Sequence, residues 1–195
     1  MVGGAASVLV AAYMVAARPW VALSGASTSG LLAEHRSDVV LRDAELLLAD
    51  VPPLKSLSDN SLRFAAMPSF GRRWMAVALA RTKAGAVGNL AVLDRAAGTV
   101  SKRKVQVTAR AYDEMMKRWD SEADGYWGDM RMWADGSPLG FERRRGRHIT
   151  SGIGNSPCHY DGLGNLAAIY LGPQIPELLD LRAPEFDKLK KSDAC

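Results

Sequence analysis

The dipeptide Asp135-Gly136 is the sequence feature that most restricts how this chain can fold. A two-residue turn of this kind tolerates positive φ angles and joins neighbouring antiparallel strands. The turn also sets the strand register, which places Met132 opposite Leu139 and Met130 opposite Phe141. We therefore predict a β-hairpin with one apolar face that packs against a core.

The other face of this predicted hairpin carries two tryptophans and four charged side chains. They are Trp127, Asp129, Arg131, Trp133, Glu142 and Arg144. In the predicted register Asp129 lies opposite Glu142, and the two arginines lie on the diagonals. A carboxylate pair between two indole rings could bind a sugar or a cationic ligand, so these six residues are our candidate binding face. The alternative is an ordinary solvated ladder of weak ion pairs.

Four segments before this hairpin fit β-strands, and in the second of them Met75, Val77 and Leu79 alternate with small alanines. The four segments are Leu62–Met67, Trp74–Arg81, Leu90–Leu93 and Thr99–Val107, separated by turns that contain glycine. This pattern predicts a meander of antiparallel strands with ordinary hairpin loops. Residues 39–51 fit either a helix or two short strands, and periodicity does not decide between them.

One helix is clearly indicated between the meander and the hairpin. Tyr112, Met115, Met116 and Trp119 recur at helical spacing, and Thr108 can cap the first turn. A short helix over Leu166–Leu171 is expected near the C-terminus, followed by a helical turn over Pro176–Leu181. The fold class that we predict is α+β: a mostly antiparallel sheet of about five to seven strands, with one packed amphipathic helix and a short C-terminal helix.

The two ends of the chain differ from this domain in composition. Ala5–Ala17 is an apolar run followed by Arg18-Pro19, which is short for a membrane span and typical of a signal peptide. No Lys or Arg precedes it, so a buried N-terminal helix or an uncleaved anchor are the alternatives. We predict a signal peptide or membrane anchor over residues 1–26, one domain over 27–182, and a charged, flexible tail over 183–195.

The charge is mildly basic, with a net charge of +4 and a pI near 9.2. Arginines gather at Arg143–Arg147, which could meet phosphate or anionic lipid. No nucleic-acid motif accompanies them, so a nucleic-acid partner is not expected. An anion or membrane-surface binder that uses this run is one alternative function.

Cys158, His159 and His148 are the weak catalytic candidates. A thiolate needs a nearby base or positive charge, which His148 could supply to Cys158 if the chain folds back. In an oxidising compartment Cys158 could instead form a disulfide with Cys195. The spacing of these residues and Asp161 matches no standard zinc pattern, so we predict no metal site and no cofactor.

The segment Ser151–Gly164 contains four glycines and is expected to be a loop. It has neither a GxGxxG motif nor a Walker lysine, so tight turns explain its glycines better than phosphate binding. Taken together, the sequence favours an exported, periplasmic or secreted protein that binds a partner without catalysis. An envelope protein or a glycan is the expected partner, and a thiol-dependent enzyme using Cys158 is the other alternative.

Overall fold

The structure, a computed structural model, describes residues 39–123, 137–155 and 160–182. Six antiparallel strands form one sheet in the order β4-β3-β2-β1-β5-β6. The strands are β1 Asn60–Ala66, β2 Arg73–Thr82, β3 Gly85–Asp94, β4 Thr99–Thr108, β5 Leu139–Arg145 and β6 His148–Gly154. The helices are α3 Val39–Leu48, α4 Ala109–Ala123 and α5 Tyr160–Leu171, with 3-10 turns η2 Leu54–Ser56 and η3 Pro176–Leu181. The predicted α+β class is confirmed.

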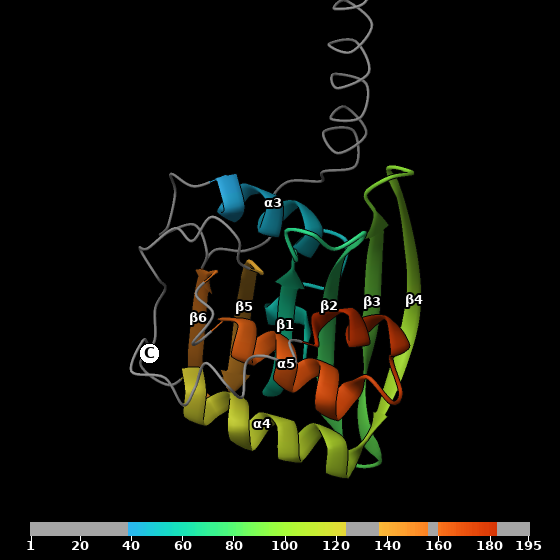
Figure 1. Ribbon diagram of the computed structural model, residues 1–195. Helices are drawn as coiled ribbons and strands as arrows, with labels where there is room; N and C mark the ends of the chain where they lie inside the picture. The colour runs from blue at the N-terminus through green and yellow to red at the C-terminus, as the bar shows by residue number, and fades with distance from the viewer. Residues whose placement is uncertain (1–38, 124–136, 156–159, 183–195) are drawn as a thin grey trace, which may run out of the picture.

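Helices cover both faces of the sheet (Figure 1). Helices α4 and α5 pack on one face, where Tyr112, Met115 and Trp119 join the larger of two buried clusters. Helix α3 packs on the opposite face, and Leu47 and Leu48 belong to the second cluster. The sheet is therefore the middle of three layers, which means that both faces of its central strands need buried side chains.

The alternating residues of β2 show how the sequence meets this requirement. Met75, Val77 and Leu79 lie in the cluster under α4 and α5, whereas Ala76 and Ala78 lie in the cluster under α3. Large side chains fill one layer, and small ones let α3 approach the sheet closely.

The predicted meander of four strands is confirmed. The predicted core residues of α4 are also confirmed, and so is its cap, where the Ala111 N–H donates to Thr108 Oγ1 at 3.3 Å.

Strand β5 corrects the predicted hairpin. Over its whole length β5 pairs with β1 on one side and with β6 on the other, so both of its edges are occupied. The predicted pairing of Leu139 and Phe141 with residues 130–132 is therefore wrong, although residues 124–136 themselves lie outside the described part. Phe141 is buried as expected, but opposite Phe64 of β1. The hairpin that does form joins β5 to β6 through Gly146, at a φ of 62°.

The predicted glycine loop over Ser151–Gly164 is also corrected. Strand β6 continues to Gly154, and helix α5 begins at Tyr160, ahead of the predicted start at Leu166. Gly152 and Gly154 lie under the ring of Tyr160, and a Cβ on Gly154 would be 2.3 Å from Tyr160 Cε2. These glycines are required because a buried tyrosine lies directly on the strand.

The terminal segments that the sequence sets apart, residues 1–26 and 183–195, lie outside the described residues. Within the described ranges, no helix has both the length and the apolar character that a membrane crossing requires.

Substitution of Gly154 tests the contact with Tyr160. We expect Gly154→Ala to lower the free energy of unfolding by about 1–3 kcal/mol, because the added methyl group overpacks a filled site. Gly164→Ala is the matched control, since a Cβ there would lie 3.7 Å from Leu181 Cβ, an ordinary contact, and alanine favours the helix. Urea denaturation that shows equal effects for the two variants would contradict this account of β6.

Candidate functional site

Two of the six residues of the predicted binding face belong to the described part of the chain. Trp127, Asp129, Arg131 and Trp133 lie outside the described residues. Glu142 and Arg144 lie on β5, on the face of the sheet that α3 covers. Glu142 is only 2% exposed, so its predicted position on a solvated face is wrong.

The buried partner of Glu142 is Arg63, the residue directly opposite on β1. Arg63 Nε lies 3.1 Å from Glu142 Oε2, and both side chains are almost fully buried. The Arg63 guanidinium also donates from Nη2 to the carbonyl of Leu48 at 3.1 Å, at the negative C-terminal end of α3. Burial lowers the pKa of Arg63, and the negative charge of Glu142 opposes that shift.

The run Arg143–Arg147 does not form one continuous basic surface. Arg143 is buried on the α4 face, where Nε and Nη2 donate to the two carboxylate oxygens of Asp120 at 2.8 and 3.1 Å. Arg145 Nη1 lies 3.5 Å from the same carboxylate. Arg144 is half-buried on the other face, and Arg147 is exposed in the turn. Arg143 is therefore not available to an anion that binds along this run, because its guanidinium is already bonded to Asp120.

Most candidates for thiol chemistry fall outside the described residues. This applies to Cys158, His159 and Cys195, and therefore also to the predicted disulfide. His148 is exposed at the start of β6, opposite Arg145. Among the described residues, no group of three His, Cys, Asp or Glu side chains could hold a metal ion.

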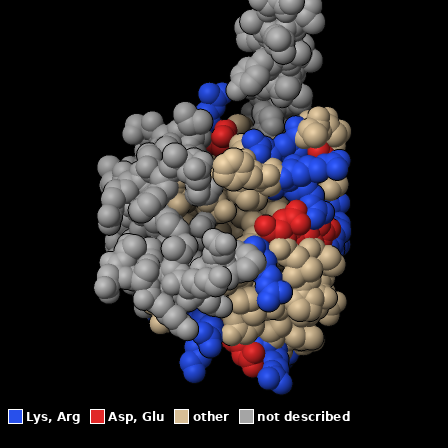
Figure 2. Space-filling view, viewed as in Figure 1, with Lys and Arg blue, Asp and Glu red and all other residues tan. Residues whose placement is uncertain are grey.

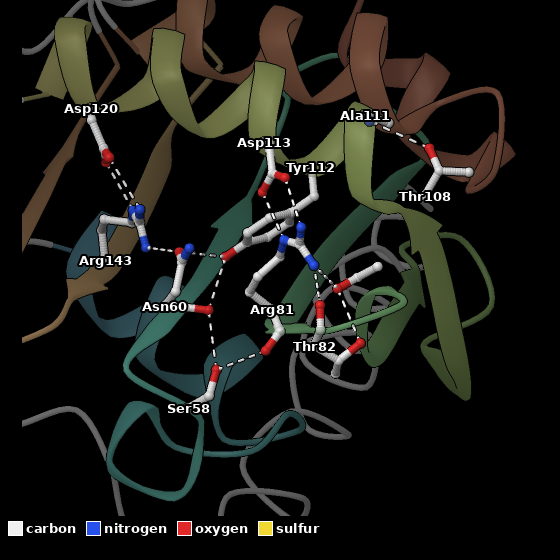
Figure 3. Close-up of polar contacts among 11 residues, drawn as sticks. Ser58, Asn60, Arg81, Thr82, Thr108, Ala111, Tyr112, Asp113, Asp120 and Arg143 are labelled. Atoms are coloured by element: carbon white, nitrogen blue, oxygen red, sulfur yellow. Dashed lines mark hydrogen bonds and ion pairs between the residues drawn. The ribbon is translucent and has the colours of Figure 1, made fainter.

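A polar seam joins α4 to the ends of β1 and β5 (Figure 3). Arg143 Nη1 donates to Asn60 Oδ1 at 2.8 Å. The hydroxyl of Tyr112 donates to the carbonyl of Asn60 at 3.3 Å. Burial raises the pKa of Tyr112, with a smaller opposing effect from the positive charge of Arg143. Tyr112 is therefore a neutral hydrogen-bond donor at physiological pH and is unsuited to act as a base.

A second tie along the same helix joins α4 to β2. Arg81 donates from Nε and Nη2 to the two carboxylate oxygens of Asp113 at 2.7 and 2.8 Å, as Figure 3 shows. The hydrogen bond from Arg81 lowers the pKa of Asp113. Paired arginines and carboxylates of this kind fix geometry, and they leave neither group available for proton transfer. The seam accordingly positions α4 and gives no evidence of catalysis.

The loop between β1 and β2 holds the most exposed large apolar side chain of the described residues. We call residues 68–72 the aromatic tip. Phe70 is 86% exposed there, against 48% for Ile169, the next highest value. The Gly71 N–H donates to the carbonyl of Pro68 at 3.0 Å and closes the turn. A large exposed ring on a closed turn is unusual enough to need an explanation.

Side chains from outside the loop hold the aromatic tip in place. Arg95, from the turn between β3 and β4, donates from Nη1 to the carbonyls of Ser69 and Gly71, each at 2.9 Å. The Arg95 guanidinium also lies 4.7 Å from the centre of the Trp74 ring. Trp74 Nε1 in turn donates to the carbonyl of Pro68 at 3.3 Å. The tip is therefore a preorganised element held by a residue of β2 and a residue of the turn between β3 and β4.

The charges beside the aromatic tip are largely compensated. Arg72 lies 2.8 Å from Asp94, and Arg73 lies 2.7 Å from Asp180. Hydrogen bonds from Arg72 and from the Ala97 N–H lower the pKa of Asp94. These two pairs cancel, and the charge of Arg95 is directed toward the carbonyls of Ser69 and Gly71. The most exposed feature of this surface is therefore an apolar ring.

Sequence reasoning missed both Phe70 and Arg63. A signal was present for each: Phe70 lies within a Pro-Ser-Phe-Gly turn, where polar residues are usual. Arg63 is a charged residue within a strand whose other positions from Leu62 onward are apolar. The paired partner of Arg63 could not be deduced, because it lies far away in the sequence.

Comparison with known proteins gives no relative from which a role could be transferred. No family model matches the chain, and neither the curated proteins nor the solved structures contain a significant match.

A double-mutant cycle tests the buried pair. Glu142→Leu should cost about 3–5 kcal/mol of unfolding free energy, because it leaves the Arg63 charge buried without its carboxylate. Arg63→Met combined with Glu142→Leu should recover most of that loss, since apolar side chains suit the α3 layer. The exposed pair Arg110–Glu114 is the control, and Glu114→Gln should leave the denaturation midpoint nearly unchanged. A double variant as unstable as Glu142→Leu alone would contradict this interpretation.

Proposed function

We propose that this protein is an exported, non-catalytic binding module that docks on a protein partner through its aromatic tip. The observation that carries the proposal is the 86% exposure of Phe70 on a loop that Arg95 and Trp74 hold in place. Aromatic residues dominate binding energy at protein interfaces when they enter a pocket. A loop that is already ordered also loses little conformational entropy on binding.

The chemistry around Phe70 indicates which kind of partner fits. An anionic membrane would require a strongly positive surface, but Arg72 and Arg73 are paired with Asp94 and Asp180. Arg95 is directed inward, to the carbonyls of Ser69 and Gly71. A protein with an apolar pocket suits the ring better, and its rim could accept hydrogen bonds from Arg72, whose side chain is 75% exposed. This favours a protein partner over a lipid surface.

The polar side chains of the seam are already bonded within the protein, which supports a binding role over a catalytic one. Arg81, Arg143 and Tyr112 are each bonded to a fixed partner from another element. Export is supported by the apolar run Ala5–Ala17, which has the length of a signal-peptide core and is followed by small residues that suit cleavage.

Site-specific photocrosslinking tests the aromatic tip. With a benzophenone amino acid in place of Phe70, we expect the full-length chain to crosslink one identifiable protein in its native host. A second set of variants carries the benzophenone at an unrelated surface position. In that background, Phe70→Ser should abolish capture of that same protein. Ile169→Ser, which removes an exposed apolar residue from α5, should retain it. Both serine variants should keep the unfolding free energy within about 0.5 kcal/mol of the parent. Equal capture with Phe70→Ser and Ile169→Ser would refute a role for the tip.

Export has its own test, in the mass of the mature protein purified from its host. Cleavage within residues 17–26 is expected, because small side chains there suit a signal peptidase. A full-length chain recovered from the cytoplasm would remove the exported part of the proposal and leave the aromatic tip to be judged by crosslinking.

A further inference from the structure

Strand β4 forms one border of the sheet. It is last in the strand order and pairs with β3 along its whole length, Thr99–Thr108. Among the described residues no strand lies on its other side (Figure 1). A border strand of this length presents a row of backbone donors and acceptors to which another strand can bind.

The backbone hydrogen bond of Thr108 shows which residues face this border. Its N–H donates to Oε1 of Gln174 at 2.6 Å, and so it points away from β3. Successive residues of a strand direct their backbone groups to opposite sides. The N–H and C=O groups of Val100, Lys102, Lys104 and Gln106 therefore also point outward, and no described residue bonds them.

The side chains along this border are basic. Figure 2 shows Lys and Arg gathered on the right of the view, over the β3–β4 side of the sheet. Arg103 is bonded to Glu177 on the α5 face, and Lys102 lies 2.6 Å from Asp50 on the α3 face. Lys104 is exposed on the α3 face, and no carboxylate of the described residues pairs with it. The open backbone row is thus accompanied by a cation that has no counter-charge.

These charges argue against a second copy of the chain as the added strand. In a symmetric antiparallel pairing of two β4 strands centred on Lys102, Arg103 or Lys104, at least one of these lysines would face a lysine of the other copy. Like charges directly opposite one another destabilise a strand pair. An acidic strand would instead place its carboxylates beside Lys102 and Lys104.

We propose that the β4 border binds an extended, acidic segment of a partner protein as an added strand. The outward backbone groups of Val100, Lys102, Lys104 and Gln106 supply the hydrogen bonds. Lys104 supplies charge selectivity through a carboxylate on the same face as its own side chain. This site is separate from the aromatic tip and does not depend on it.

Border lysines also have a simpler explanation, because they protect a sheet from unwanted pairing. The two explanations differ in a measurable way. Protection alone predicts that β4 rejects every extended peptide, whereas a binding site predicts selection by charge and use of the outward amides.

The probe is a synthetic peptide that alternates valine with glutamate, compared with the same peptide carrying lysine in place of glutamate. We expect the full-length protein to bind the glutamate peptide and to reject the lysine peptide, as measured by fluorescence anisotropy. Hydrogen exchange should slow at the amides of Lys102, Lys104 and Gln106 when the peptide is bound. Exchange at Arg103 and Val105, whose amides face β3, should change little.

Two variants of Lys104 separate charge from backbone. Lys104→Glu should weaken binding of the glutamate peptide about tenfold, because an attractive cross-strand pair becomes repulsive. Lys117→Glu, on the exposed face of α4, is the matched control and should leave binding unchanged. Lys104→Pro removes an outward N–H, which a border strand tolerates, and should also weaken binding. If Lys104→Pro does not fold, a peptide N-methylated at the amides that face β4 gives the same test.

The proposal is overturned if the glutamate peptide does not bind, if both peptides bind alike, or if Lys104→Glu and Lys117→Glu have equal effects. It is also overturned if exchange protection appears away from the outward amides of Val100, Lys102, Lys104 and Gln106. None of these outcomes bears on the aromatic tip.

Discussion

The pairing of β1 with β5 is the contact on which the rest of this fold depends, because it joins the N-terminal meander to the C-terminal half. Two opposed pairs hold its register, one on each face of the sheet. Arg63 and Glu142 form an ion pair under α3. Phe64 and Phe141 lie opposite each other under α4, each with its ring centre 5.6 Å from that of Trp119. A slip by one residue would exchange the faces and bury a carboxylate against the aromatic cluster, so the alternatives to this register are strongly disfavoured.

The local parts of this fold could be predicted from sequence, whereas the contact between β1 and β5 could not. Strand alternation and helical spacing depend on near neighbours, which is why the meander and α4 were predicted correctly. The Asp135-Gly136 signal pointed to a local partner for β5, but β1 and β6 occupy both of its edges. The parity of β5 was nevertheless correct, since Phe141 and Glu142 do lie on opposite faces. The error was to treat the second face as solvated.

A usable signal for the second covered face was present in β2. Its alternate positions are Ala76, Ala78 and Ala80, and an exposed face would be expected to carry polar residues there. Small apolar residues indicate that another layer approaches closely. That inference would also have placed Arg63 and Glu142 in the interior, and so would have removed Glu142 from the candidate binding face. The partner of each buried charge could not be deduced from the sequence. Arg63 and Glu142 are neighbours in space, although 78 residues lie between them along the chain.

The same arrangement explains why the two binding surfaces that we propose lie at the borders of this molecule. Its buried and half-buried charges hold α3, α4 and η3 on the sheet, through pairs such as Arg63–Glu142, Arg143–Asp120 and Arg103–Glu177. Groups held in this way contribute to geometry, and they cannot also rearrange around a ligand. Among the described residues, the ring of Phe70 and the outward row of β4 are two features that face solvent without such a partner. The turn between β3 and β4 links them, because Arg95 follows β3 directly and bonds the aromatic tip. The recognition that we propose therefore relies on surfaces that are already ordered before a partner arrives.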